Sequence, residues 1–94
     1  MSSDFSKDFR DIAHEVVAGN ALLRGVIPEA MAGFGGLGKA AYKDGVLSSK
    51  TKELIALAIG VAVRCDGCVA WHAKVAFERG ATREEVGEVL AVAI

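Results

Sequence analysis

Three side chains capable of thiol chemistry lie within eight consecutive residues. Cys65 and Cys68 form a CxxC pair, and His72 follows four residues after the second cysteine. On a helix this spacing places all three side chains on one face. A helix N-terminus and a nearby imidazole both lower the pKa of a thiol from about 8.5 toward neutrality, and the thiolate is the reactive species. A second thiol one turn away can close a disulfide once the first is oxidised. We therefore predict a redox-active dithiol site.

The same three residues could also be core fillers or metal ligands. Free cysteine is among the most buried residue types, but the joint spacing at a helix start argues against packing alone. A structural zinc site needs a fourth ligand, for which only His14 or a carboxylate remains, without zinc-finger spacing. Covalent haem attachment needs a histidine directly after the second cysteine, where Val69 stands. We expect no metal and no other cofactor.

Glu53 is a further candidate because it is an acidic residue in the first turn of an otherwise apolar helix. It precedes Cys65 by twelve residues. If this helix packs antiparallel on the next one, Glu53 falls near the level of His72 to Ala76, where a carboxylate could orient the imidazole and take up its proton. Equally, Glu53 could be an acidic residue favourably placed on the helix dipole. The spacing leaves both interpretations open.

A glycine-rich segment from Gly33 to Ala40 nearly matches a phosphate-binding loop. Ala40 stands where a serine or threonine would hold Mg²⁺, and no strand precedes the segment. We therefore attribute its four glycines to close helix packing, at some cost in helix stability.

Helical spacing recurs along the whole chain and strand-like alternation is almost absent, so we expect an all-α fold. The first predicted helix is amphipathic, runs from about residue 5 to residue 18 and ends near Gly19 and Asn20. The second starts at Pro28 and ends by Gly45. Its predicted inner stripe consists of Met31, Phe34, Leu37 and Ala41.

Three more helices follow. The third begins at Ser48 or Ser49 and is apolar nearly all round, which predicts a central position in the core. The fourth runs from about Asp66 and Gly67 to Arg79 and is stopped by Gly80. The last begins with a capping box at Thr82 to Glu85 and carries Val86, Val89, Leu90 and Ala93 on one face. It reaches the final residue without a cap, so we expect a partner or further residues to complete it.

Length and composition predict one domain, residues 1–94, with more apolar surface than so short a chain can bury. Hydrophobic residues make up 52% of the chain, and the excess predicts burial between subunits.

The longest apolar run has ten residues, against about 20 needed to cross a bilayer, so we expect no membrane partner. The first residues have neither a signal nor a transit pattern, which favours a cytoplasmic location. With a net charge of −1 and no basic stretch, we expect no nucleic-acid partner.

The cysteine and histidine spacing, together with two flanking segments, resembles the carboxymuconolactone decarboxylase family, specifically its alkylhydroperoxidase AhpD-like members with a CxxC. The flanking segments are Lys50-Thr-Lys-Glu53-Leu-Ile-Ala-Leu-Ala-Ile and Ala76-x-x-x-Gly80-Ala81-Thr82-x-Glu84-Glu85, and the resemblance covers about residues 28–94. It implies a compact bundle of five to six helices, assembled as a homotrimer or homohexamer. It also implies peroxide reduction coupled to an external dithiol donor, a lipoyl- or thioredoxin-like protein.

Carried over by position, the resemblance makes Cys68 the thiol that meets the peroxide and Cys65 the thiol that resolves it to an intrachain disulfide. Glu53 and His72 become the proton relay. Helix-terminus electrostatics alone favour Cys65 as the attacking thiol, but we expect Cys68 because a positioned base outweighs a screened partial charge. Asp66 stands between the cysteines, where its charge should raise a thiol pKa. Two alternatives remain: a non-enzymatic redox-sensing or assembly module, and a carboxymuconolactone decarboxylase-like enzyme with incidental cysteines.

Overall fold

The computed structural model describes residues 7–94, and within this range the regular structure is five α-helices joined by short connections. They are α1 (Phe9–Val26), α2 (Pro28–Tyr42), α3 (Ser49–Ala62), α4 (Asp66–Glu78) and α5 (Arg83–Ala93). No strand occurs among the described residues. The predicted all-α fold is confirmed.

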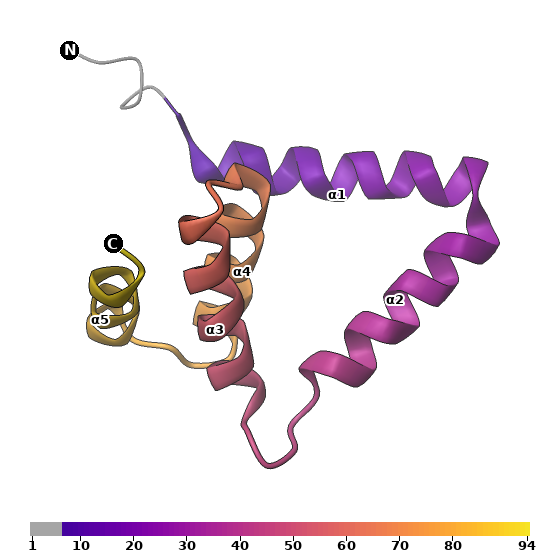
Figure 1. Ribbon diagram of the computed structural model, residues 1–94. Helices are drawn as coiled ribbons and strands as arrows, with labels where there is room; N and C mark the ends of the chain where they lie inside the picture. Colours follow the sequence, from indigo (N-terminus) through magenta and orange to yellow (C-terminus); the bar gives the residue numbers. More distant parts are fainter. Residues whose placement is uncertain (1–6) are drawn as a thin grey trace.

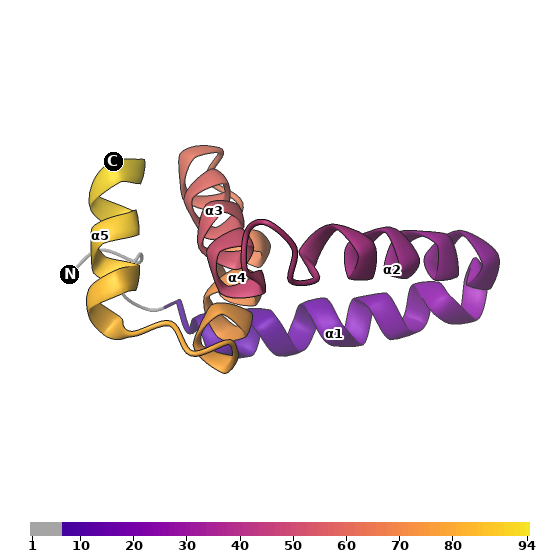
Figure 2. The same cartoon turned by 90° about the horizontal axis from the view of Figure 1, so that it is seen from below.

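The helices are arranged as an open triangle. As Figure 1 shows, α1 forms one side, α2 the second, and the packed pair α3 and α4 the third, while α5 lies outside the triangle beside α3. Seen from below, the arm made by α1 and α2 extends to one side of the other three helices (Figure 2). The molecule is correspondingly flat, with extents of 40 × 39 × 21 Å.

The core is small and lies mainly between α3 and α4, where α1 crosses α4. Leu57 is the largest fully buried side chain among the described residues. The other buried apolar residues are mostly alanines: Ala13, Ala56, Ala70, Val75, Ala76 and Ala81. The predicted central helix, α3, does contact α4, α5 and α2, but Ile55 and Ile59 on it are about half exposed.

The predicted end of the first helix is wrong. Helix α1 passes through Gly19 and Asn20 and continues to Val26, because one glycine costs a helix only about 1 kcal/mol and the residues that follow are good helix formers. The helix stops before Pro28, since a proline disfavours helical backbone in the residue preceding it. At its other end Asp8 is the N-cap and accepts the Arg10 N–H. Phe5, part of the predicted helix, lies outside the described residues.

The predicted inner stripe of α2 is also wrong for the single chain. Helix α2 contains no buried residue, and Phe34 and Leu37 remain about two thirds exposed. The four glycines of the phosphate-loop-like segment have open space around them rather than a packed helix. The physical reason is that α2 contacts mainly α1, and α3 and α4 only near its C-terminal end, so its stripe has nothing to pack on within one chain.

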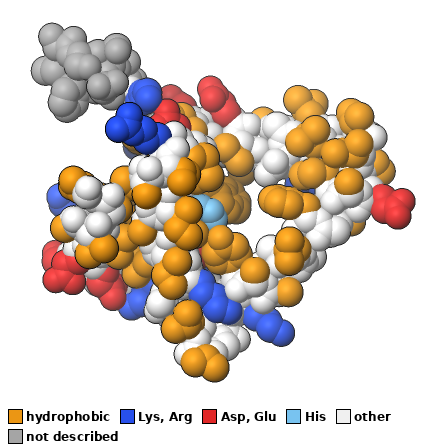
Figure 3. Space-filling view, in the orientation of Figure 1, with side chains coloured by type: hydrophobic (Ala, Val, Ile, Leu, Met, Phe, Trp, Pro, Cys, Tyr) orange, Lys and Arg blue, Asp and Glu red, His pale blue; other side chains and the backbone are white. Residues whose placement is uncertain are grey.

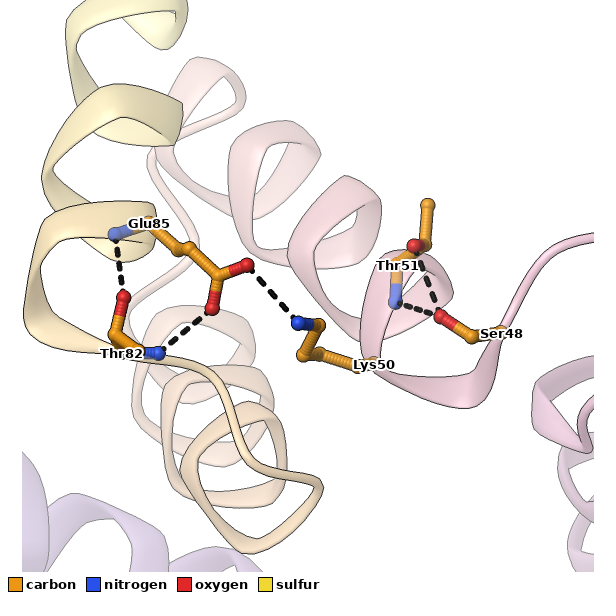
Figure 4. A network of polar contacts seen from close by, with 5 residues as sticks. All are labelled: Ser48, Lys50, Thr51, Thr82 and Glu85. Atoms are coloured by element: carbon orange, nitrogen blue, oxygen red, sulfur yellow. Dashed lines mark hydrogen bonds and ion pairs between the residues drawn. The ribbon is translucent and has the colours of Figure 1, made fainter.

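The starts of the last three helices agree with the sequence. Ser48 accepts the Thr51 N–H at the start of α3, and Thr82 and Glu85 form the capping box of α5. Lys50 of α3 reaches Glu85 of α5 at 2.9 Å and ties the two helices together (Figure 4). Helix α4 ends before Gly80, which adopts a φ of 93° that favours glycine. The less exposed face of α5 is the predicted one: Val86, Val89, Leu90 and Ala93.

Large apolar side chains cover much of the surface, as the orange atoms in Figure 3 show. Those more than about two thirds exposed are Leu22, Val26, Phe34, Leu37, Val46, Val92 and Ile94. Among the described helices, none is both long and apolar enough to cross a membrane.

Candidate thiol site

The site is built on the hairpin of α3 and α4. After α3 the chain reverses within a few residues, and Arg64 takes a left-handed φ of 59° to make the turn. The Cys65 N–H then donates to the Gly60 carbonyl at 2.9 Å. This turn makes Cys65 the N-cap residue of α4, so the CxxC lies at a helix N-terminus as the sequence predicts.

The two cysteines are directly bonded. Cys65 and Cys68 form a disulfide, with 5.2 Å between their Cα atoms. The Cys65 sulfur also accepts the Cys68 N–H at 3.2 Å and so acts as the side-chain cap of α4. A thiolate at this sulfur would be stabilised by the same N–H and by the partial positive charge of the helix end.

Gly60 brings α3 against the dithiol, and it is not among the residues predicted for the site. A Cβ on Gly60 would lie 2.9 Å from the Cys68 Cβ and 3.4 Å from the Cys68 carbonyl carbon. Any larger residue would therefore push the two helices apart beside Cys68. The only sequence signal is a lone glycine inside an apolar helix.

Glu53 and His72 meet between the two helices. His72 Nδ1 lies 2.6 Å from Glu53 Oε2, and the side chains are 17% and 6% exposed. The predicted juxtaposition is confirmed: the helices are antiparallel and place the carboxylate at the level of the imidazole. A carboxylate can only accept a hydrogen bond, so the tautomer that fits a Glu53 carboxylate is the one with Nδ1 protonated, which leaves Nε2 for proton exchange.

Tyr42 at the end of α2 is a third member of this cluster. No spacing in the sequence indicated that it would lie beside His72. Its ring stacks on the His72 imidazole with centroids 5.5 Å apart and an angle of 26° between the planes. Burial, and secondly the negative charge of Glu53, raise the pKa of the Tyr42 phenol above its ordinary value of 10.0. The phenol therefore stays protonated at neutral pH.

The charge of Asp66 beside the dithiol is partly offset by a neighbour. Lys7 Nζ lies 2.8 Å from Asp66 Oδ2, and both side chains are about half exposed. Because exposed ion pairs are screened by water, this pair contributes at most about 1 kcal/mol.

A metal site is not assembled within residues 7–94. Among these residues no group of three or more histidine, cysteine or acidic side chains is placed to hold a metal ion. His14, the one further imidazole considered from the sequence, is therefore not joined to the cysteine and histidine cluster as a ligand.

The model of the carboxymuconolactone decarboxylase family matches residues 28–94, which include α2 to α5 and the whole thiol site. This chain belongs to the carboxymuconolactone decarboxylase family. The resemblance drawn from the motifs is confirmed at that level.

Solved structures of carboxymuconolactone decarboxylase family proteins have the same fold. One from Legionella pneumophila is 43% identical, superposes with a TM-score of 0.83 and covers 98% of this chain and 79% of its own. Another, from Thermotoga maritima, is 37% identical with a TM-score of 0.64 and covers 69% of this chain and 67% of its own. An involvement in the antioxidative response has been suggested for the Thermotoga protein.

Curated relatives of this family member are longer than the chain. An uncharacterised protein of Cupriavidus necator is 49% identical over 67 residues, which are 71% of this chain and 59% of that protein. A protein of the Paracoccus denitrificans cox locus is 40% identical over 57 residues, which are 61% of this chain and 51% of that protein. The chain thus spans about half the length of the curated relatives it matches.

Proposed function

We propose that the protein is a thiol-dependent peroxidase of the alkylhydroperoxidase type. The observation that carries this proposal is the CxxC disulfide at the start of α4, one helical turn from an imidazole held by a buried carboxylate. A dithiol, a base and an orienting group are the parts that a nucleophilic thiol needs. The suggested antioxidative role of the Thermotoga relative agrees with this chemistry.

The reaction uses the reduced dithiol. The Cys68 thiolate attacks the terminal oxygen of a hydroperoxide, the O–O bond breaks, and an S–O bond forms to give a sulfenic acid and an alkoxide. The alkoxide takes up a proton and leaves as the alcohol. The Cys65 thiol then attacks the Cys68 sulfur, an S–S bond forms, and the hydroxyl group leaves with a proton as water. An external dithiol reduces the disulfide and completes the cycle.

Glu53 and His72 move the protons in this scheme. The imidazole accepts the Cys68 proton at Nε2 and returns it to the departing alkoxide. Glu53 accepts the hydrogen bond from Nδ1–H and so orients the ring. Its negative charge also stabilises the imidazolium that exists between the two proton transfers. Tyr42 covers one face of the ring and keeps it in this orientation.

The donor, the location and the assembly complete the proposal. A lipoyl- or thioredoxin-like protein would supply the external dithiol, in the cytoplasm, where thiols are kept reduced. The exposed apolar faces of α1 and α2 would be covered by further copies of the chain in a homotrimer or homohexamer, because soluble monomers seldom expose patches of this extent.

Peroxide consumption in the presence of a dithiol reductant tests the function. With the reductant, the wild type should reduce peroxide repeatedly and Cys68→Ser should be inactive. Without the reductant, Cys65→Ser should consume one equivalent of peroxide and stop at a sulfenic acid that dimedone traps. Turnover that survives Cys68→Ser would contradict the mechanism. If peroxide closes the disulfide but no turnover occurs with any dithiol, the protein is a redox-sensing module instead.

A further inference from the structure

An open pocket of about 710 Å³ lies where α2 ends and α3 begins, and four of its eight lining residues are basic. Lys39 and Lys43 come from α2 and its end, Lys50 from the first turn of α3, and Arg79 from the end of α4. The remaining lining residues are Tyr42, Asp44, Ser48 and Ser49. Figure 3 shows blue side chains gathered at the lower end of the triangle, near the connection from α2 to α3.

The charge of this pocket is opposite to that of the whole chain. Four cations and one carboxylate line it, whereas the chain as a whole has a net charge of −1. Asp44 is already engaged, because its Oδ1 accepts the Ser49 N–H at 2.7 Å. Lys50 is paired with Glu85. Asp44 keeps its charge, so the field that a ligand meets comes from Lys39, Lys43 and Arg79 less this one carboxylate, and a concave surface concentrates such a field.

One buried polar side chain, Ser49, orients Arg79 at the pocket. The Arg79 Nε donates to Ser49 Oγ at 3.2 Å, which orients the guanidinium. Ser49 is 8% exposed, so its hydroxyl is held in place by the surrounding helices. The terminal guanidinium nitrogens can then bind a planar carboxylate with two parallel hydrogen bonds.

Tyr42 connects the pocket to the thiol site, since one face of its ring packs on His72 and the residue also lines the pocket. Along α3, Ser49 marks the pocket, Glu53 the proton relay and Gly60 the dithiol. At 1.5 Å per residue, the pocket lies roughly 16 Å from the level of Cys68. An alkyl chain of roughly a dozen carbon–carbon bonds, each about 1.5 Å long, spans that distance.

We propose that the pocket binds the carboxylate of an organic hydroperoxide whose alkyl chain carries the peroxide group to Cys68. This proposal rests on the peroxidase function and names its substrate class: long-chain acids with an internal hydroperoxide. The orange side chains on the α3–α4 side of the opening in Figure 3 provide an apolar surface for such a chain. The carboxylate anchors one end, and the thiol site reacts with the other.

The first test compares linoleic acid hydroperoxide with its methyl ester, which lacks the charge, and with cumene hydroperoxide. In the wild type, kcat/KM should be higher for the acid than for the ester. In the double variant K39A/K43A the ratio of acid to ester should fall by about tenfold for each charged hydrogen bond lost. The matched control R24A/R83A also removes two cations, both outside the pocket, and should keep the wild-type ratio. An acid-to-ester ratio near one in the wild type overturns the proposal while leaving the peroxidase function intact.

The second test is binding of decanoate, which needs no catalysis and therefore separates the pocket from the function. Calorimetry should show binding to the wild type and to R24A/R83A, and weaker binding to K39A/K43A, which keeps the Arg79 guanidinium. If none of the three peroxides is reduced, the proposed peroxidase function is wrong, and decanoate binding still tests whether the pocket binds a carboxylate. The proposed carboxylate site is wrong if the wild type does not bind decanoate, or if it binds inorganic phosphate but not decanoate. So does sedimentation showing that K39A/K43A alone dissociates an assembly, because the basic side chains would then hold a carboxylate of a second copy.

Discussion

His72 Nδ1 and Glu53 Oε2 lie 2.6 Å apart across the interface of α3 and α4, and the Glu53 side chain is only 6% exposed. A buried carboxylate without a partner would be costly, so the imidazole stabilises the fold as well as the chemistry. His72 follows Cys68 by four residues in α4, so both side chains lie on one face of that helix. Packing of the hairpin and the proposed proton transfer at the thiol site would therefore share one hydrogen bond.

Removing either partner of this bond should slow the reactions of the Cys68 thiol. In a Cys65→Ser background, Glu53→Gln and His72→Asn should each raise the pKa of the reduced Cys68 thiol, because the base or its orienting group is lost. Each unit of pKa reduces the thiolate fraction at neutral pH by up to tenfold. The measurement is the iodoacetamide alkylation rate against pH. Glu88→Gln on α5 is the matched control, and circular dichroism checks folding. Identical rate profiles in all variants would show that the relay does not act on this thiol.

Tyr42 should titrate above its ordinary pKa, and the chain contains no other tyrosine to obscure the signal. Burial disfavours the phenolate, and the Glu53 charge disfavours it further. The phenolate absorbance at 295 nm should therefore appear above pH 10.0, and Glu53→Gln should shift the midpoint down. Since the folded state favours the protonated phenol, its contribution to stability is complete below the unfolded-state pKa and is lost as pH rises through the folded one. A midpoint at the ordinary value, unmoved by Glu53→Gln, would contradict the burial and charge assigned to this ring.

Gly60→Ala should destabilise the protein because the new methyl group meets Cys68 Cβ at 2.9 Å. Overpacking of this kind typically costs about 1 to 3 kcal/mol of the free energy of unfolding. Gly87→Ala is the matched control: it is also in a helix, has nothing within 4 Å, and should stabilise by up to about 1 kcal/mol. Urea unfolding of the reduced proteins measures both. Equal effects of the two substitutions would show that α3 and α4 do not approach closely at Cys68.

The capping box of α5 should make stability depend on pH in the acid range. The Thr82 N–H first, and the Lys50 ammonium second, hold the pKa of Glu85 below its ordinary value of 4.5. The ionised carboxylate therefore stabilises the folded state above that value, and this contribution is lost as pH falls through the lower, folded-state pKa. Thermal unfolding should show Glu85→Gln less stable than wild type at pH 7, with the difference shrinking below about pH 4.5. Glu84→Gln, one residue away, should show a smaller and flatter difference. A Glu85→Gln difference that persists unchanged at low pH would rule out the charge as its cause.

The sequence by itself determined the features that depend on neighbours within a turn or two. Cys65, Cys68 and His72 share a face because helical periodicity places them there. The helix starts at Ser48 and Thr82 and the stop at Gly80 follow from local hydrogen bonds and backbone preferences. The family could be identified for the same reason, since its motif is a set of residues at short spacings. The position of Glu53 beside His72 could be predicted because a short turn between two helices forces them to pack antiparallel.

Only the tertiary structure decided what depends on segments far apart in the chain. Tyr42 on His72, Gly60 against Cys68 and the basic pocket each combine different helices, and the pocket gathers cations that are scattered along a chain with no basic stretch. The stripe on α2 failed as a core prediction because periodicity shows that a face is apolar, not what covers it. The end of α1 was missed because a weak local penalty at Gly19 does not stop a helix whose next residues favour it. Long-range packing depends on the sum of many such contacts, which no single spacing in the sequence records.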